Sequence, residues 1–141
     1  MYTGEYNHTI DEKGRLIIPT KFRELLGNSF VVTKSLDGCL SIYDSIKWDE
    51  LEKKLNQLPM TNKSARELKR FLLGGANIVE LDKQGRILIT QPLRKSAKLL
   101  GDISLVGVGD HIEIWNTEEW NKISNYGDFE NIAQSMEGLG I

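Results

Sequence analysis

The chain has 141 residues, 27% of them charged, and a formal net charge of −2 at pH 7. Its single cysteine excludes an intrachain disulfide framework and a cysteine-based zinc site. No apolar run approaches the roughly 18 residues of a membrane span, and the N-terminus lacks the pattern of a signal peptide. We therefore expect a soluble cytoplasmic protein.

The first predicted unit is a β-hairpin followed by a short helix. Residues 6–10 alternate between apolar and polar side chains, and residues 15–18 form a short apolar run. Between these strands Gly14 is placed for a positive φ. A proline that suits the first helical turn and a glycine that suits the end predict a helix over 19–27. The apolar face of this helix should hold Phe22, Leu25 and Leu26.

A second hairpin and two longer helices follow. Residues 30–34 and 40–43 predict strands joined by a turn at Asp37-Gly38. Asp44 and Ser45 can cap a helix over 46–56. A linking helix, preceding Gly74 and Gly75, is predicted from Thr61 to Leu73. The apolar positions of the capped helix are Trp48, Leu51, Leu55 and Leu58.

The second half of the chain repeats the first. The segment from Ile10 to Ile18 (IDEKGRLII) returns as the segment from Leu81 to Ile89 (LDKQGRILI). We call residues 11–15 the first turn and residues 82–86 the second turn. A duplication of this extent indicates two copies of one supersecondary unit.

The duplication divides the chain into two repeats, a link and a tail. We predict repeat 1 over 5–47 with its helix to about 58, a linking helix over 61–75, and repeat 2 over 76–119 with its helix to about 125. Asn116-Thr117 caps that last helix, whose buried face should hold Trp120 and Ile123. Each repeat is too small to bury a sufficient core alone, so the two should complete one another. The tail, 126–141, has no clear period and is either disordered or docked on a neighbour.

Positive charge gathers around the two turns. Residues 10–23 carry a net charge of +2 and residues 81–95 carry +3, whereas residues 110–141 carry −6. Phosphate binding needs a local basic surface, while an acidic chain suppresses indiscriminate binding. This distribution favours specific DNA binding through several weak contacts over a DNA-coating protein.

On these residues the chain resembles the MraZ family of bacterial transcriptional regulators. The resemblance covers essentially the whole chain, and its most specific stretches are Gly4 to Arg23 (with His8-Thr9-Ile10-Asp11-x-Lys13-Gly14-Arg15 and Pro19-x-Lys21-Phe22-Arg23) and Asp82-x-x-Gly85-Arg86. It implies an α+β, mainly β fold. In such a fold two tandem SpoVT/AbrB-like β-β-α-β-β-α repeats form one pseudo-symmetric swapped-hairpin β-barrel with peripheral helices.

The resemblance also implies a function and its partners. Family members form ring-shaped homo-oligomers and bind tandem repeats in the promoter of their own operon, which carries division and cell-wall genes. The expected partners are therefore double-stranded DNA and further copies of the chain, at the nucleoid. We expect no cofactor, no metal, no membrane and no small-molecule substrate.

The resemblance assigns DNA contact to the Asp-x-x-x-Arg turns, hence to Arg15 and Arg86. An arginine offers a planar fork of donors that fits phosphate or the edge of guanine, and an aspartate four residues earlier can orient it. The remaining predicted DNA-binding residues are Lys13, Lys83, Lys21, Arg23 and Arg94, and the turn-orienting residues are Asp11, Gly14, Asp82 and Gly85. Repeat 2 has Thr90-Gln91-Pro92 where repeat 1 has Pro19-Thr20-Lys21, so the two repeats need not contact DNA equally.

Several plainer interpretations stand beside this one. The turn pairs could be surface salt bridges of little energetic value. The basic side of the linking helix should be a solvated face. His8 and His111 lack a second ligand at a metal-like spacing, and Trp48 and Trp120 suit a core or a subunit interface. The basic side of the linking helix consists of Lys63, Arg66, Lys69 and Arg70.

Two other function classes fit the sequence less well. An AbrB-fold protein-binding module, such as an antitoxin, usually carries one DNA-binding repeat and a flexible toxin-wrapping tail, so a complete second repeat counts against it. An enzyme would need a convergent nucleophile, base and oxyanion donor, and Cys39 has no evident base partner. We expect no enzymatic activity.

Overall fold

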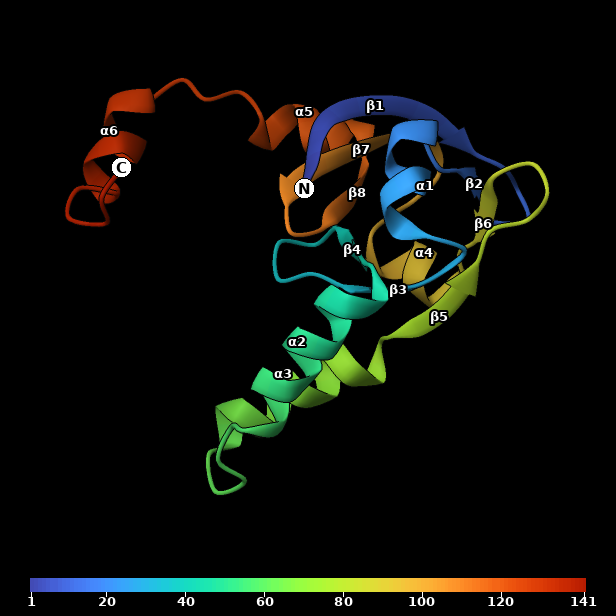
Figure 1. The fold of residues 1–141 in the computed structure, drawn as a ribbon. Helices are drawn as coiled ribbons and strands as arrows, with labels where there is room; N and C mark the ends of the chain where they lie inside the picture. The colour runs from blue at the N-terminus through green and yellow to red at the C-terminus, as the bar shows by residue number, and fades with distance from the viewer.

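The computed structural model describes residues 1–141, which form a nearly closed antiparallel barrel of eight strands with six helices outside it (Figure 1). The order of the strands around the barrel is β5-β3-β4-β8-β7-β1-β2-β6. The elements are β1 (Tyr2–Ile10), β2 (Arg15–Ile17), α1 (Thr20–Leu26), β3 (Ser29–Lys34), β4 (Leu40–Tyr43), α2 (Ser45–Asn56), α3 (Lys63–Gly74), β5 (Asn77–Glu80), β6 (Arg86–Leu88), α4 (Gln91–Ser96), β7 (Gly101–Gly109), β8 (Ile112–Asn116), α5 (Thr117–Ile123) and α6 (Phe129–Ser135). This mainly β architecture with peripheral helices confirms the predicted fold class.

Pairs of strands from the two halves of the chain alternate around the barrel. Four pairings join one half to the other: β1 with β7, β3 with β5, β2 with β6, and β4 with β8. A single cluster of 19 buried residues fills the interior and includes Leu16 and Phe22 from the first half and Ile87 and Leu105 from the second. Neither half has a sheet or a core of its own, so each repeat completes the other.

Each of the two longer helices begins at a capping side chain, and the cap of α2 is the predicted one. Asp44 accepts from the backbone N–H of Lys47 at 2.9 Å and starts α2, and Asn62 accepts from that of Ala65 at 3.0 Å and starts α3. A side-chain acceptor satisfies one of the free N–H groups of the first turn. α2 and α3 extend side by side away from the barrel (Figure 1). None of the chain's helices combines the length and the apolar character needed to cross a membrane.

The predicted apolar faces of two short helices are wrong at one position each. Leu25 in α1 is 47% exposed, and Ile123 in α5 is 48% exposed. Each stands three residues after the aromatic that anchors its helix, Phe22 or Trp120. Because a helix turns about 100° per residue, a three-residue step leaves a side chain some 60° away from its anchor. A helix of two turns touches the barrel along a stripe too narrow to cover that side chain.

The C-terminal tail contains one further short helix, α6. Figure 1 shows α6 standing apart from the barrel, beyond an extended segment that follows α5. Every residue from Asn125 to Ile141 is exposed. The tail therefore adds nothing to the core.

Candidate nucleic-acid interface

The first turn is organised by one carboxylate. Asp11 Oδ1 accepts from the backbone N–H of Lys13 at 3.0 Å and of Arg15 at 2.8 Å, while Asp11 Oδ2 accepts from Arg15 Nε at 2.6 Å. The backbone N–H of Gly14 donates to Asp11 O at 3.0 Å, and Gly14 adopts the predicted positive φ of 87°. An aspartate that bonds to the backbone two residues ahead is a common device for fixing a turn.

The second turn has the same bonding pattern. Asp82 Oδ1 accepts from the backbone N–H of Gln84 and of Arg86, both at 2.9 Å. Asp82 Oδ2 accepts from Arg86 Nε at 2.9 Å, and Gly85 has a φ of 77°. The sequence duplication is therefore also a duplication of hydrogen bonds, in which each aspartate contacts the arginine four residues later.

These bonds keep both carboxyl groups ionised. Donation from the backbone N–H of Arg15, followed by its guanidinium, lowers the pKa of Asp11, and Arg86 lowers the pKa of Asp82 in the same way. In each turn the only side-chain hydrogen bond from the arginine to the carboxylate comes from Nε. The Nη groups at the end of the guanidinium are left for a ligand, and that end is the part of the fork that fits phosphate or guanine.

The pairing of β2 with β6 puts both arginines on one face. Leu16 pairs with Ile87, and these two side chains are 0% and 1% exposed. Arg15 pairs with Leu88, and Ile17 pairs with Arg86. Because successive residues of a strand point to opposite sides, the four flanking side chains lie outside the barrel. We call this surface the ribbon face; it consists of Arg15, Ile17, Arg86 and Leu88.

Two members of the ribbon face were absent from the residues predicted to bind DNA. Ile17 is 43% exposed and Leu88 is 57% exposed, although both are aliphatic. A signal was present in the sequence, because residues 16–18 and 87–89 are unbroken apolar runs. Alternation along a strand requires one member of such a run to face outward.

The predicted lysines lie in the two turns and in α1. Lys13 belongs to the first turn, Lys83 to the second turn and Lys21 to α1, and all three are exposed. None of them takes part in an ion pair of the chain. Their ammonium groups are thus available to an outside anion.

Arg23 and Arg94 occupy different surroundings from the other predicted residues. Both are half-buried. Arg23 Nη2 donates to Thr20 Oγ1 at 2.6 Å, and Arg94 Nη1 donates to the backbone O of Glu12 at 3.2 Å. Arg94 of the second half therefore bonds to the first turn.

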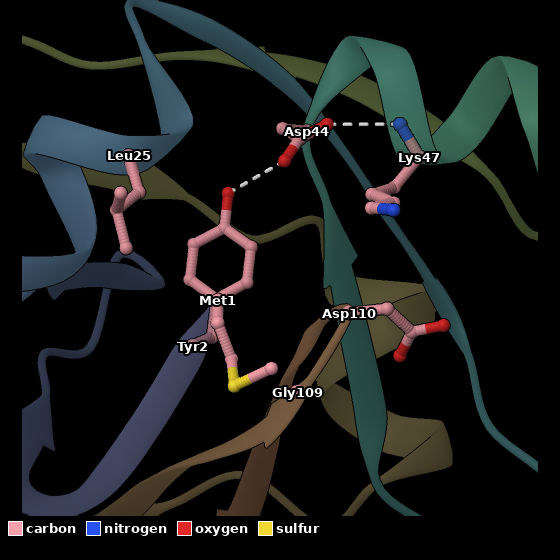
Figure 2. Close-up of a pocket in the computed structure, with 7 residues that line it drawn as sticks. All are labelled: Met1, Tyr2, Leu25, Asp44, Lys47, Gly109 and Asp110. Atoms are coloured by element: carbon pink, nitrogen blue, oxygen red, sulfur yellow. Dashed lines mark hydrogen bonds between the residues drawn. The ribbon is translucent and has the colours of Figure 1, made fainter.

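A hollow of about 400 Å³ lies elsewhere, between β1, α1, α2 and the end of β7 (Figure 2). There Tyr2 Oη donates to Asp44 Oδ2 at 2.7 Å, while the other oxygen of Asp44 caps α2. Burial, followed by this bond to a carboxylate, raises the pKa of Tyr2. The hollow contains a link between β1 and the start of α2, so its polar groups are explained by the fold.

The other chemically notable side chains have local partners. Burial raises the pKa of Cys39 to about 12, so its thiol stays protonated at neutral pH. His111 Nδ1 lies 2.6 Å from Asp110 Oδ1, and its ring stacks on Tyr43. No group of three or more histidine, cysteine or acidic side chains is arranged to hold a metal ion. The half-buried Trp120 packs against the ring of Trp115 and donates to Glu5.

The fold and the ribbon face together define a class: a double-repeat β-barrel that presents two Asp-x-x-x-Arg turns on one surface. The chain belongs to the MraZ family. The family model described as "MraZ protein, putative antitoxin-like" matches residues 1–71 and again residues 72–139.

Relatives that align over their full length with about half of their residues identical agree with this family match. The chain is 52% identical over 142 residues to the "Transcriptional regulator MraZ" of Clostridium tetani. It is 51% identical over 143 residues to the proteins of the same name from a Thermoanaerobacter species and from Alkaliphilus oremlandii. Each alignment covers 100% of both chains.

Proposed function

We propose that this protein is a transcriptional regulator that binds double-stranded DNA sequence-specifically through its ribbon face and turns. Its target is a set of tandem repeats in the promoter of its own operon, which carries division and cell-wall genes. The relatives named as transcriptional regulators support the class of function. The geometry of the two turns supports the mode of binding.

The observation that most supports this proposal is that, in both turns, the arginine Nε donates a hydrogen bond to the aspartate. A carboxylate repels DNA phosphate, so an acid beside each exposed arginine is unfavourable for simple electrostatic attraction. It does fix the direction of the guanidinium, and a fixed fork can distinguish one base edge from another. A two-stranded ribbon also has dimensions that the major groove accommodates.

The exposed lysines of the turns and of α1 supply the sequence-independent part of binding. Lys13, Lys83 and Lys21 contact phosphates on either side of the groove, which gives affinity and register without reading sequence. Repeat 2 has Pro92 at the position of Lys21, so the lysine of α1 has no counterpart at the matching position of α4. The two halves of the ribbon face therefore contribute unequally.

Assembly multiplies these modest contacts. One chain offers two arginine turns, and a ring-shaped homo-oligomer offers many at regular distances. Once one subunit has bound its box, the neighbours bind at a high effective concentration, and avidity rises by about 10²–10⁴. The target should consequently contain several short boxes at even spacing, and the assembly should lie at the nucleoid.

Footprinting on the DNA upstream of the protein's own gene, with salt titrated, tests the proposal. The wild-type protein should protect evenly spaced boxes with a steep dependence on salt. Protection should vanish in the Arg15→Ala/Arg86→Ala double variant and persist in Lys54→Ala, a control that removes an exposed lysine from α2. Equal protection by the double variant would reject the turns as the DNA-binding elements.

The description of the family model suggests a second function that can be tested, antitoxin activity. A protein of that kind would bind a small toxin in a fixed ratio. Capture of the tagged full-length chain from its own cells should therefore return mainly further copies of itself. Recovery of a stoichiometric small protein, with no footprint on the promoter, would favour the antitoxin hypothesis.

A further inference from the structure

Each turn rests on an arginine from the opposite repeat. A methyl group placed on Gly85 of the second turn would lie 2.6 Å from Cζ of Arg23, which belongs to α1. A methyl group placed on Gly14 of the first turn would lie 2.8 Å from Nε of Arg94, which belongs to α4. Both guanidinium groups therefore press against the glycine of a turn that is distant in sequence.

The backbone follows the same crossed pattern. The N–H of Ile18, just after β2, donates to Gly85 O at 2.9 Å. The N–H of Ile89, just after β6, donates to Gly14 O at 2.8 Å. Each arginine comes five residues after one of these donors. A backbone bond and an arginine thus reach each turn together, from the same segment of the other repeat.

Stability alone is a poor explanation for these two side chains. The Nε atoms of Arg23 and Arg94 are buried without a hydrogen-bond partner. A desolvated donor on a charged group costs free energy that an aliphatic side chain would not. The same costly arrangement nevertheless occurs in both repeats.

We propose that Arg23 positions the second turn and Arg94 positions the first turn, each acting on DNA binding through the turn it supports and not through a DNA contact of its own. This inference rests on the proposed function, in which Arg15 and Arg86 contact DNA. A guanidinium wedged against the glycine restricts the turn to the conformation that its aspartate already favours. Restricting a loop to its bound conformation lowers the entropic cost of binding and so raises affinity.

The crossed arrangement gives a specific test by double-mutant cycles in the full-length chain. The probe is a duplex carrying the region upstream of the gene. Arg23→Ala should weaken binding about tenfold in the wild-type background and in Arg15→Ala, but hardly at all in Arg86→Ala, where the supported turn is already inactive. Arg94→Ala should weaken binding in the wild-type background and in Arg86→Ala, but hardly at all in Arg15→Ala. Equal losses in both backgrounds would overturn the proposal.

The salt dependence separates positioning from direct contact. Removal of one phosphate-binding cation from each subunit should flatten the slope of log K against log salt by about 0.9 per neutralised phosphate. Arg23→Ala should leave that slope unchanged, and Arg23→Lys should bind as weakly as Arg23→Ala because lysine has the charge without the planar group. A flatter slope for Arg23→Ala together with rescue by Arg23→Lys would establish a phosphate contact and refute the positioning role.

Hydrogen exchange in the DNA-free protein tests whether Arg23 and Arg94 support the turns, independently of the proposed function. Arg23→Ala should speed amide exchange over residues 82–86 and leave residues 11–15 unchanged, and Arg94→Ala should do the opposite. Faster exchange in both turns would indicate general destabilisation and would overturn the inference. If Arg15→Ala and Arg86→Ala bind DNA normally, the proposed function fails. The exchange pattern alone then decides whether Arg23 and Arg94 position the turns.

Discussion

Arg15 and Arg86 lie diagonally opposite each other on the β2–β6 ladder, and each pairs with an aliphatic residue. Arg15 pairs with Leu88 and Arg86 pairs with Ile17, around the buried central pair of Leu16 and Ile87. A slip of one residue in this register would put Arg15 and Arg86 on opposite faces, because paired residues share a face and the side chains of a strand alternate between faces. The register therefore fixes two donors on one surface, and it does so from two segments that are distant in sequence.

Removal of either turn arginine should weaken binding to the promoter. A bidentate contact to a base contributes about 1–3 kcal/mol, so Arg15→Ala and Arg86→Ala should each weaken binding to a single box by about tenfold to a hundredfold. A gel-shift titration measures the change, and light scattering should show an unchanged oligomer. Wild-type affinity in both single variants would contradict the assignment.

Neutralising the orienting aspartates should reduce discrimination more than affinity. Asp11→Asn and Asp82→Asn leave both arginines charged but replace the carboxylate that holds Nε. The ratio of affinities for promoter and scrambled DNA should fall about tenfold, while binding to scrambled DNA stays equal or rises. Competition titrations against both duplexes give the ratio. An unchanged ratio would show that the aspartates only stabilise the turns.

The flanking lysines should govern the salt dependence. Lys13→Ala, Lys83→Ala and Lys21→Ala should each flatten the salt slope by about 0.9 for every phosphate that the lysine neutralises, with little change in sequence preference. Pro92→Lys, which installs the lysine missing from repeat 2, should steepen it. Fluorescence anisotropy across a salt series measures these slopes. If Pro92→Lys had no effect, position 92 would lie away from the DNA.

The turn carboxyl groups should titrate below their ordinary value of 3.8. Since the folded pKa lies below the unfolded one, each carboxylate adds stability above pH 3.8, and this stability is lost as the pH falls through the folded pKa. Arg15→Ala should raise the pKa of Asp11 only partly, because the backbone N–H of residue 15 is the larger cause and stays in place. Carbon-13 NMR of the carboxyl carbons follows this titration. A pKa of Asp11 at or above 3.8 would contradict the bonding seen in the first turn.

The interleaved barrel should unfold as one unit. Leu16→Ala removes the centre of the β2–β6 pair and should cost about 2–5 kcal/mol of unfolding free energy. Ile17→Ala, an exposed neighbour on the same strand, should cost about 0.5 kcal/mol or less. Chemical denaturation followed by tryptophan fluorescence and circular dichroism should give coincident single transitions. Two separate transitions would mean that the repeats fold independently.

The sequence by itself determined the local features of this protein. A glycine placed for positive φ, an aspartate four residues before an arginine, and caps at Asp44 and Asn116 all depend on atoms a few residues apart. Local spacing decides whether such groups can meet, so the sequence was sufficient to predict both turns and the starts of α2 and α5. The duplication likewise required only a comparison of the chain with itself.

Only the tertiary structure decided how the two turns relate. The shared face of Arg15 and Arg86 and the support of each turn by the opposite repeat both follow from the way the two repeats pair. That pairing joins residues about 70 positions apart, and its register is set by closure of a barrel around one core. Packing of two complete repeats fixes it, and no local pattern of residues contains that information.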